Sequence, residues 1–201
     1  FCLQTERQQD LQAAYKIAQL IYTSSPDASI ADYSEAGMRL SAAIEREVLT
    51  PFFQAIYSYL DEHGVSKLGD ITLGPAKQYQ LSMMPPLQAP QWRSVQSGQL
   101  SARNRPESGV KMVKVKGASQ LSARDRTLIN QFLAQCEHPI ALCLSQKGGQ
   151  AASSLDQISK LRSIAVHAES FLYRWQYELL HQLIAGKKGK GGLLRQLFAL
   201  S

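Results

Sequence analysis

The stretch SLDQISKLRSIAVHAESFLYRWQYELLHQLIA, residues 154–185, is the longest strongly periodic segment of the chain, and it decides the fold class. Apolar residues recur at three- and four-residue spacing in both of its halves, which is typical of amphipathic helices. Ser154 and Gln157 form a capping-box pattern, so we expect a helix to begin at this point. Residues 168–170 can either end that helix or let it continue. The stretch therefore predicts one long helix, or two helical segments that meet near His167.

The same spacing predicts helices in most of the remaining chain. They are expected over residues 5–22, 29–63, 75–84 and 122–136. Pro51 interrupts the second of these, and it either kinks the helix or begins a new one that Thr50 caps. Ser122 and Asp125 form a further cap, and the apolar residues 140–144 are interpreted as a short helix. The apolar face of the first helix is expected to consist of Leu11, Ala14, Tyr15, Ala18 and Ile21.

Two segments lack this periodicity and are basic. Residues 84–120 are rich in Pro, Ser, Gln, Arg and Gly, so we predict a long inserted loop, with a possible strand pair near residues 110–115. Residues 186–201 are expected to form a flexible basic tail with a short terminal helix, following a helical bundle domain over residues 1–185. The candidate nucleic-acid-binding residues in these two segments are Arg103, Arg105, Lys187, Lys188 and Lys190. The alternative is that both segments are solvated without a ligand.

The composition narrows the class of protein. The 201 residues are 44% hydrophobic and 19% charged, which is typical of a folded chain, and the net charge of +6 favours a polyanionic partner. Cys2, Cys136 and Cys143 form no CxxC spacing, so we expect a reducing, cytoplasmic location. The sequence contains no apolar run of about 18 residues and no signal peptide, so no membrane association is expected. The start at Phe1 suggests a fragment or a processed product.

Few residues suit catalysis. The four histidines are scattered, without metal-ligand spacing, and neither a phosphate-binding glycine loop nor a G-x-S-x-G elbow is present, so no metal or cofactor is expected. Arg162 and His167 remain, since histidine exchanges protons near pH 7 and an arginine fork stabilises charge on phosphate oxygens. On one continuous helix their side chains point about 140° apart, so they converge only if the helix ends near His167 or if two copies meet. Arg174 and His181 form a second such pair, with six residues between them. The alternative for Arg162 and His167 is a surface arginine and a half-buried histidine at a helix end.

Three short segments resemble a known family. They are ERE at residues 45–47 followed by LTPFF at 49–53, LGDITLG at 68–74, and LRSIAVHAE at 161–169. Together they resemble the HEPN superfamily, the all-helical domains of bacterial defence, toxin and CRISPR-associated proteins, over about residues 36–185. The resemblance implies that Arg162 and His167 are the catalytic pair of a metal-independent endoribonuclease that works across a symmetric dimer. Many members of the superfamily serve instead as non-catalytic RNA-binding or dimerising modules.

The sequence thus predicts an all-α, HEPN-like helical bundle that binds RNA, acts as a homodimer or in a larger complex, and cleaves RNA in antiviral defence or as a toxin. His167 would be the general acid or base and Arg162 the phosphate clamp. The alternative function is a non-catalytic dimerisation or interaction module of a larger effector. A third hypothesis is a nucleic-acid-binding accessory subunit of a multiprotein complex.

Overall fold

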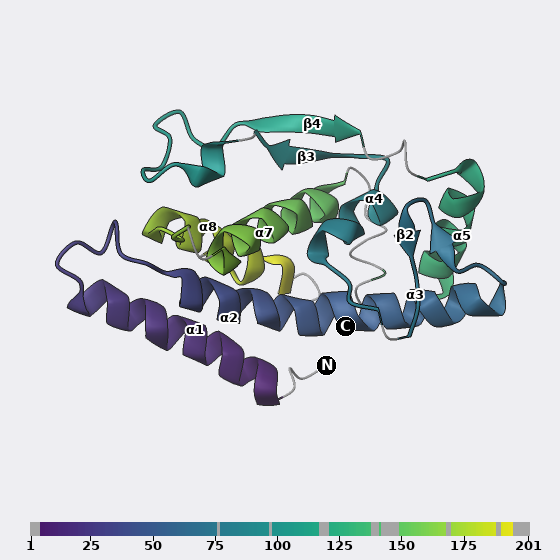
Figure 1. Cartoon of the computed structure of the whole chain (residues 1–201), viewed down its shortest axis with the longest axis horizontal. Helices are drawn as coiled ribbons and strands as arrows, with labels where there is room; N and C mark the ends of the chain where they lie inside the picture. The colour runs from purple at the N-terminus through teal and green to yellow at the C-terminus, as the bar shows by residue number, and fades with distance from the viewer. Residues whose placement is uncertain are drawn as a thin grey trace.

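The computed structural model describes residues 5–75, 77–96, 98–116, 121–137, 141, 149–167, 170–187 and 190–194, without the side chains of residues 5–7, 116 and 190. Across these residues the chain is mostly helical, as the periodicity predicts, with short strand pairs in addition. Figure 1 shows a long helical rod through the length of the molecule, with α1 on one side of it and α7 and α8 on the other. None of the described helices is long and apolar enough to cross a membrane.

The rod consists of α2 (Ser34–Ile44), the π-helix η1 (Glu45–Leu49) and α3 (Thr50–Glu62), which follow one another without a break. In the π-helical turn the backbone N–H of Thr50 donates to the carbonyl oxygen of Glu45, five residues earlier. Pro51 stands in the first turn of α3, where its missing N–H costs least. Of the two alternatives for Pro51, a new helix capped by Thr50 is wrong: Leu49 and Thr50 have helical backbone angles, the Thr50 side chain caps nothing, and the helical backbone continues through Pro51 by way of the π-helical turn.

The periodic stretch at residues 154–185 folds as two helices, α7 (Gln150–Val166) and α8 (Arg174–Ile184). Since α7 ends at Val166 and His167 has extended backbone angles, the prediction of a joint near His167 is confirmed. The predicted start at Ser154 is wrong, because α7 begins four residues earlier, after Gly149. Gly149 has φ +66°, a conformation that favours glycine, and this turn leads directly into the helix.

The joint between α7 and α8 is packed against α2. The backbone N–H of Tyr33 donates to the carbonyl oxygen of Leu172 at 2.8 Å, and the N–H of Leu172 donates to the Ser34 hydroxyl at 3.0 Å. Leu172 is fully buried and lies over Gly37, where the absence of a side chain lets the two segments approach. The core therefore centres on the joint, and the direction of α8 is fixed by contacts with α2.

The predicted long loop over residues 84–120 is a partly regular structure, which corrects that expectation. It contains the helix α4 (Met84–Gln88) and two antiparallel strands, β3 (Gln91–Val95) and β4 (Met112–Lys116). The strand near residues 110–115 is thus confirmed, whereas its partner β3 was not predicted, because strand pairing joins residues about 20 apart. The two strands lie along α7 (Figure 1).

The described part of the predicted flexible tail is also ordered, against expectation. The strands β5 (Gly186–Lys187) and β6 (Lys190–Gly191) pair in antiparallel fashion, and Leu193 and Leu194 are buried in the core. Burial of these two leucines holds the hairpin against the bundle, so the segment is not a free linker. Of the short terminal helix predicted from Leu193 onward, Leu193 and Leu194 are helical and the rest lies outside the described residues, as does the short helix at residues 140–144 apart from Ala141.

Further elements flank the rod, among them a short antiparallel pair after α3, β1 (Lys67–Leu68) and β2 (Ile71–Thr72). The helix α1 (Thr5–Ser24) packs along α2, and Thr5 is the first residue that the structure describes. The helix α5 (Ala123–Gln135) begins with the predicted capping box, in which Ser122 accepts from the Asp125 N–H at 3.1 Å. The helix expected over residues 75–84 is wrong: Gly74 and Lys77 form a turn, and the described residues up to Gln80 are irregular until a short 3-10 helix, η2 (Leu81–Met83), leads into α4.

Candidate functional site: an aromatic and basic cavity between α1 and α8

Arg162 and His167, the predicted catalytic pair, diverge within one chain. The Arg162 guanidinium forms an ion pair with Glu45 of η1, with Nε 2.5 Å from Oε1. His167 is exposed at the end of α7 and lines a hollow of about 340 Å³, whose walls do not include Arg162. The helix ends one residue before His167, and this is too late to rotate the two side chains onto one face.

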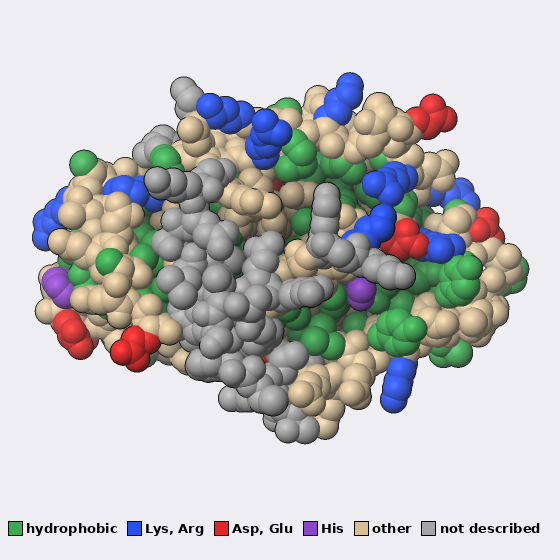
Figure 2. Space-filling view, turned by 180° about the vertical axis from the view of Figure 1, so that it is seen from behind, with side chains coloured by type: hydrophobic (Ala, Val, Ile, Leu, Met, Phe, Trp, Pro, Cys, Tyr) green, Lys and Arg blue, Asp and Glu red, His purple; other side chains and the backbone are tan. Residues whose placement is uncertain are grey.

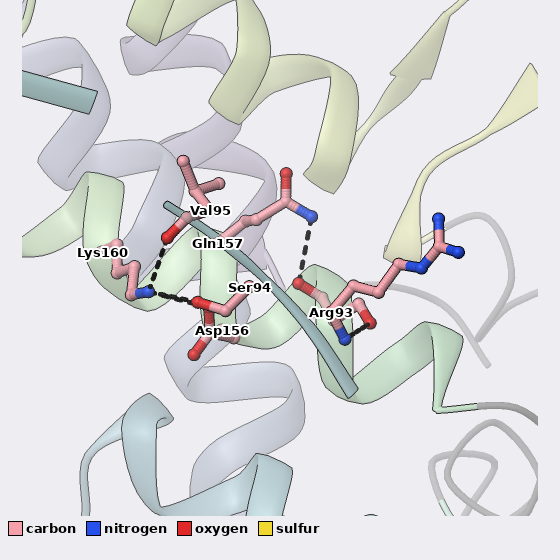
Figure 3. Close-up of polar contacts among 7 residues, drawn as sticks. Arg93, Ser94, Val95, Asp156, Gln157 and Lys160 are labelled. Atoms are coloured by element: carbon pink, nitrogen blue, oxygen red, sulfur yellow. Dashed lines mark hydrogen bonds and ion pairs between the residues drawn. The ribbon is translucent and has the colours of Figure 1, made fainter. Parts of the chain in front are cut away.

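The hollow beside His167 borders a polar network that holds β3 on α7 (Figure 3). The Ser94 hydroxyl donates to Asp156 at 2.7 Å, and the Lys160 ammonium donates to the Ser94 hydroxyl and to the Val95 carbonyl oxygen. A serine beside a lysine can act as a nucleophile in other proteins. Here the Ser94 hydroxyl is held between Asp156 and Lys160, and Ser94 is not among the residues that line the hollow, so its hydroxyl joins the strand to the helix.

The predicted nucleic-acid-binding residues separate into groups. Arg105 and Lys187 line one cavity between α1 and α8, although they lie 82 positions apart in sequence. Arg103 is exposed outside this cavity, near Asp27, whose pKa is lowered by hydrogen bonds from Ser29 and, to a smaller extent, by the Arg103 charge. Lys188 and the side chain of Lys190 lie outside the described residues.

The α1–α8 cavity, as we call it, has a volume of about 480 Å³. Its walls come from one face of α1, from α8, from the connection between η3 (Gln99–Ser101) and β4, and from β5. From behind, the face over α8 and the end of α1 exposes hydrophobic side chains next to Lys and Arg side chains (Figure 2). Segments far apart in sequence thus form a site that is at once apolar and cationic.

Tyrosines supply much of the apolar wall. Tyr15 and Tyr22, seven residues apart on α1, share one helical face and are 61% and 53% exposed. The expectation that Tyr15 belongs to the buried face of this helix is wrong, because the small residues Ala14 and Ala18 make the close contact with the body. Tyr33 is buried behind them and stacks on Tyr177 of α8, with 5.5 Å between the ring centroids.

Arg174 and His181, the second pair noted in the sequence, line the same cavity. Seven residues of helix turn about 700°, or nearly two whole turns, so both side chains project from one face of α8. The Arg174 Nε donates to Glu178 at 2.7 Å, and its guanidinium carbon lies 4.6 Å from the centre of the Tyr22 ring. Burial lowers the pKa of His181 below its usual 6.5, so the imidazole is neutral at pH 7.

Two tyrosine hydroxyls in the cavity wall stay protonated. Burial raises the pKa of Tyr33, and it raises the pKa of Tyr177 to about 12. The Tyr177 hydroxyl lies 3.4 Å from the carbonyl oxygen of Ala14, to which it donates. The buried Tyr33 hydroxyl has no hydrogen-bond partner among the residues that the structure describes. Sequence reasoning missed Tyr33, because no local pattern shows that a hydroxyl lacks a partner.

Neither similarity to known proteins nor a group of metal ligands assigns a function to this site. Comparisons with protein-family models, with curated proteins and with solved structures found no match. In the described part of the chain, His, Cys, Asp and Glu side chains do not gather in groups of three that could hold a metal ion. The arrangement of charge and aromatic surface in the α1–α8 cavity is therefore the strongest structural guide to function.

Proposed function

We propose that the chain is a HEPN-like domain that binds single-stranded RNA in the α1–α8 cavity. Proteins that bind single strands combine cations that follow the sugar-phosphate backbone with aromatic rings on which bases stack. The cavity supplies the cations Arg105 and Lys187 and the exposed rings Tyr15 and Tyr22, while Arg174 is paired with Glu178 in the same wall. This combination of cations and rings in one cavity is the observation that carries the proposal.

The charge of the whole chain supports the same proposal. A net charge of +6 attracts a polyanion at long range and raises its local concentration at the surface. The choice of RNA rests on the resemblance of residues 36–185 to the HEPN superfamily. Binding of a DNA strand with the same base sequence measures that preference directly, because the 2′-hydroxyl is the main difference between the two backbones.

Fluorescence anisotropy with a labelled single-stranded RNA of about ten nucleotides tests the proposal. The wild-type chain is expected to bind with an affinity that falls as salt rises. Arg105→Ala and Lys187→Ala should each weaken binding and reduce the salt slope by about 0.7, the value for one lost phosphate contact on a single strand. Lys67→Ala, a control at an exposed residue of β1 (Lys67–Leu68) outside the cavity, should change neither. Equal affinity of the wild type and the Arg105→Ala/Lys187→Ala double variant would refute the site.

Metal-independent cleavage of the bound RNA is a second proposal, and the exposure of His167 at the end of α7 favours it. His167 would exchange a proton with the attacking or leaving oxygen, and Arg162 would stabilise the phosphate charge. Since the two side chains diverge within one chain, the Arg162 of one copy would act with the His167 of another.

Incubation of the protein with end-labelled RNA in EDTA tests cleavage. The wild type should cut the RNA, whereas His167→Ala and Arg162→Ala should each be inactive, and an equal mixture of the two variants should regain part of the activity if the pair forms across a dimer. Cleavage that persists unchanged in His167→Ala would refute the catalytic role of His167. A chain that binds no RNA but forms dimers, as measured by light scattering, would instead be the interaction module.

A further inference from the structure

The Tyr33 hydroxyl is a polar group that the described chain leaves unsatisfied. Tyr33 is 2% exposed and lines the α1–α8 cavity, and its hydroxyl lacks a hydrogen-bond partner among the described residues. The charges that act on this hydroxyl include those of Arg174 and Glu178, and both residues line the same cavity. A buried hydroxyl without a partner costs free energy, and a ligand atom that reached it would recover that cost.

The dimensions of the cavity suit a small planar ligand. Its volume of about 480 Å³ lies within the range of about 300–1,000 Å³ that is typical of small-molecule sites. Trp175 in its wall is fixed in place, because its indole N–H donates to the carbonyl oxygens of Ala102 and Arg103, each at 3.1 Å. Together with the exposed ring of Tyr22, it offers aromatic surface on which a planar group can stack.

The polar groups of the wall suit the edge of a nucleobase. His181 is neutral at pH 7, so one of its ring nitrogens can donate a hydrogen bond while the other accepts one. The side-chain amides of Gln19 and Gln182 also line the cavity, and each carries donors and an acceptor. The edges of all four bases mix donors with acceptors in the same way, and single-stranded RNA presents these edges to proteins.

We propose that the α1–α8 cavity holds one unstacked nucleobase of the RNA strand, while the flanking phosphates contact Arg105 and Lys187. This inference rests on the proposed RNA binding and adds that one base carries a large share of the affinity. Tyr33 donates to the edge of that base, and Trp175 and Tyr22 contact its faces. A free nucleotide has the same chemistry, so the test includes it as a separate ligand.

The test uses ten-unit strands of sugar and phosphate in which only one central position carries a base. Affinity of the full chain for this strand is compared with that for the fully abasic strand by fluorescence anisotropy. The single base should raise the affinity about tenfold, which is the order expected for one stacked base. A second base next to the first should add less than threefold, since the cavity has room for one.

Two variants with matched controls locate the effect. Tyr33→Phe keeps the ring and removes the hydroxyl, and Tyr22→Ala removes a stacking surface. Each should reduce the gain from the single base at least threefold, where the gain is measured relative to the same variant's affinity for the abasic strand. Tyr57→Phe on α3 and Leu20→Ala, an exposed residue of α1 outside the cavity, are the controls and should keep the full gain. Circular dichroism confirms that each variant is folded.

The outcomes separate this inference from the proposed function. If both strands bind with a salt-dependent affinity but the base adds nothing, RNA binding stands and the base site is refuted. If neither strand binds, both proposals fail. A nucleoside monophosphate that binds as tightly as the single-base strand would assign the cavity to free nucleotides and overturn the strand proposal.

Discussion

Gly37 gives a quantitative test of the packing at the joint between α7 and α8. An alanine Cβ at this position would lie closer to the Leu172 Cδ2 than Cβ atoms come to other atoms in proteins. It would lie 3.6 Å from the Leu180 Cδ2 and 3.7 Å from the Ala165 Cβ, which are ordinary contacts. The conflict is therefore confined to one methyl group of Leu172, and removal of that methyl group should abolish it.

The expected change in the free energy of unfolding is the balance of helix propensity against overpacking. In the wild type, Gly37→Ala gains about 1 kcal/mol of helix propensity, and overpacking costs about 1–3 kcal/mol, so the net cost is about 0–2 kcal/mol. Leu172→Ala alone should cost about 2–5 kcal/mol, because the side chain is fully buried. In the Leu172→Ala background the conflict is absent, and Gly37→Ala should stabilise the chain by about 1 kcal/mol. The expected coupling between the two substitutions is therefore about 1–3 kcal/mol.

Urea unfolding followed by far-ultraviolet circular dichroism measures the free energy of unfolding of the four proteins in this cycle. Met38→Ala is the control, since Met38 lies on the same helix but is 40% exposed. Its effect should add to that of Leu172→Ala within about 0.5 kcal/mol. Additivity within the same limit for Gly37→Ala and Leu172→Ala would refute the close approach of α2 to the joint.

Three further predictions concern charged and titratable side chains. Asp10→Ala should cost about 1–3 kcal/mol in urea unfolding, because the buried Asp10 carboxylate lies 2.5 Å from Arg46 and joins α1 to η1; a cost below about 0.5 kcal/mol would contradict this role. A double-mutant cycle on Arg162 and Glu45, both part-exposed, should give a coupling below about 1 kcal/mol, and a value above about 2 kcal/mol would show that Arg162 serves stability. Since burial lowers the pKa of His181, the unfolded chain binds its proton first as the pH falls below about 6.5, and the free energy of unfolding should decrease from there down to the lowered pKa. His181→Gln should lessen this decrease between pH 7.5 and 5.5, and an equal decrease in wild type and variant would refute the burial of the imidazole.

The helices could be predicted because their signals are local. Ser122 and Asp125 lie three residues apart, and their capping box forms as the sequence indicates. The same pattern at Ser154 predicts the wrong first residue. A local cap stabilises a helix less than the packing of the whole of α7 does, and α7 begins directly after the turn at Gly149. Local signals thus identify that a helix exists more reliably than they locate its first residue.

The features that the sequence could not indicate depend on contacts between residues that are far apart in the chain. The strand β3 forms only because β4, about 20 residues later, pairs with it on the surface of α7. Tyr15 fits the apolar spacing of α1 but is exposed, since Ala14 and Ala18 are small enough for the helix to lie close to the body. The α1–α8 cavity likewise joins segments that are far apart in sequence, so Arg105 and Lys187 could each be predicted to bind nucleic acid, but their position in one cavity could not.

The joint between α7 and α8 positions a different pair of side chains from the pair that the sequence suggested. It does not bring Arg162 and His167 together, because Arg162 is held by Glu45 while His167 lies past the end of α7. It does set the direction of α8, and the spacing of Arg174 and His181 then presents both side chains to the tyrosines of α1. A single chain therefore contains a complete candidate binding cavity, whereas the proposed cleavage by Arg162 and His167 would require a second copy. Binding should accordingly be independent of protein concentration at levels where cleavage still rises with it.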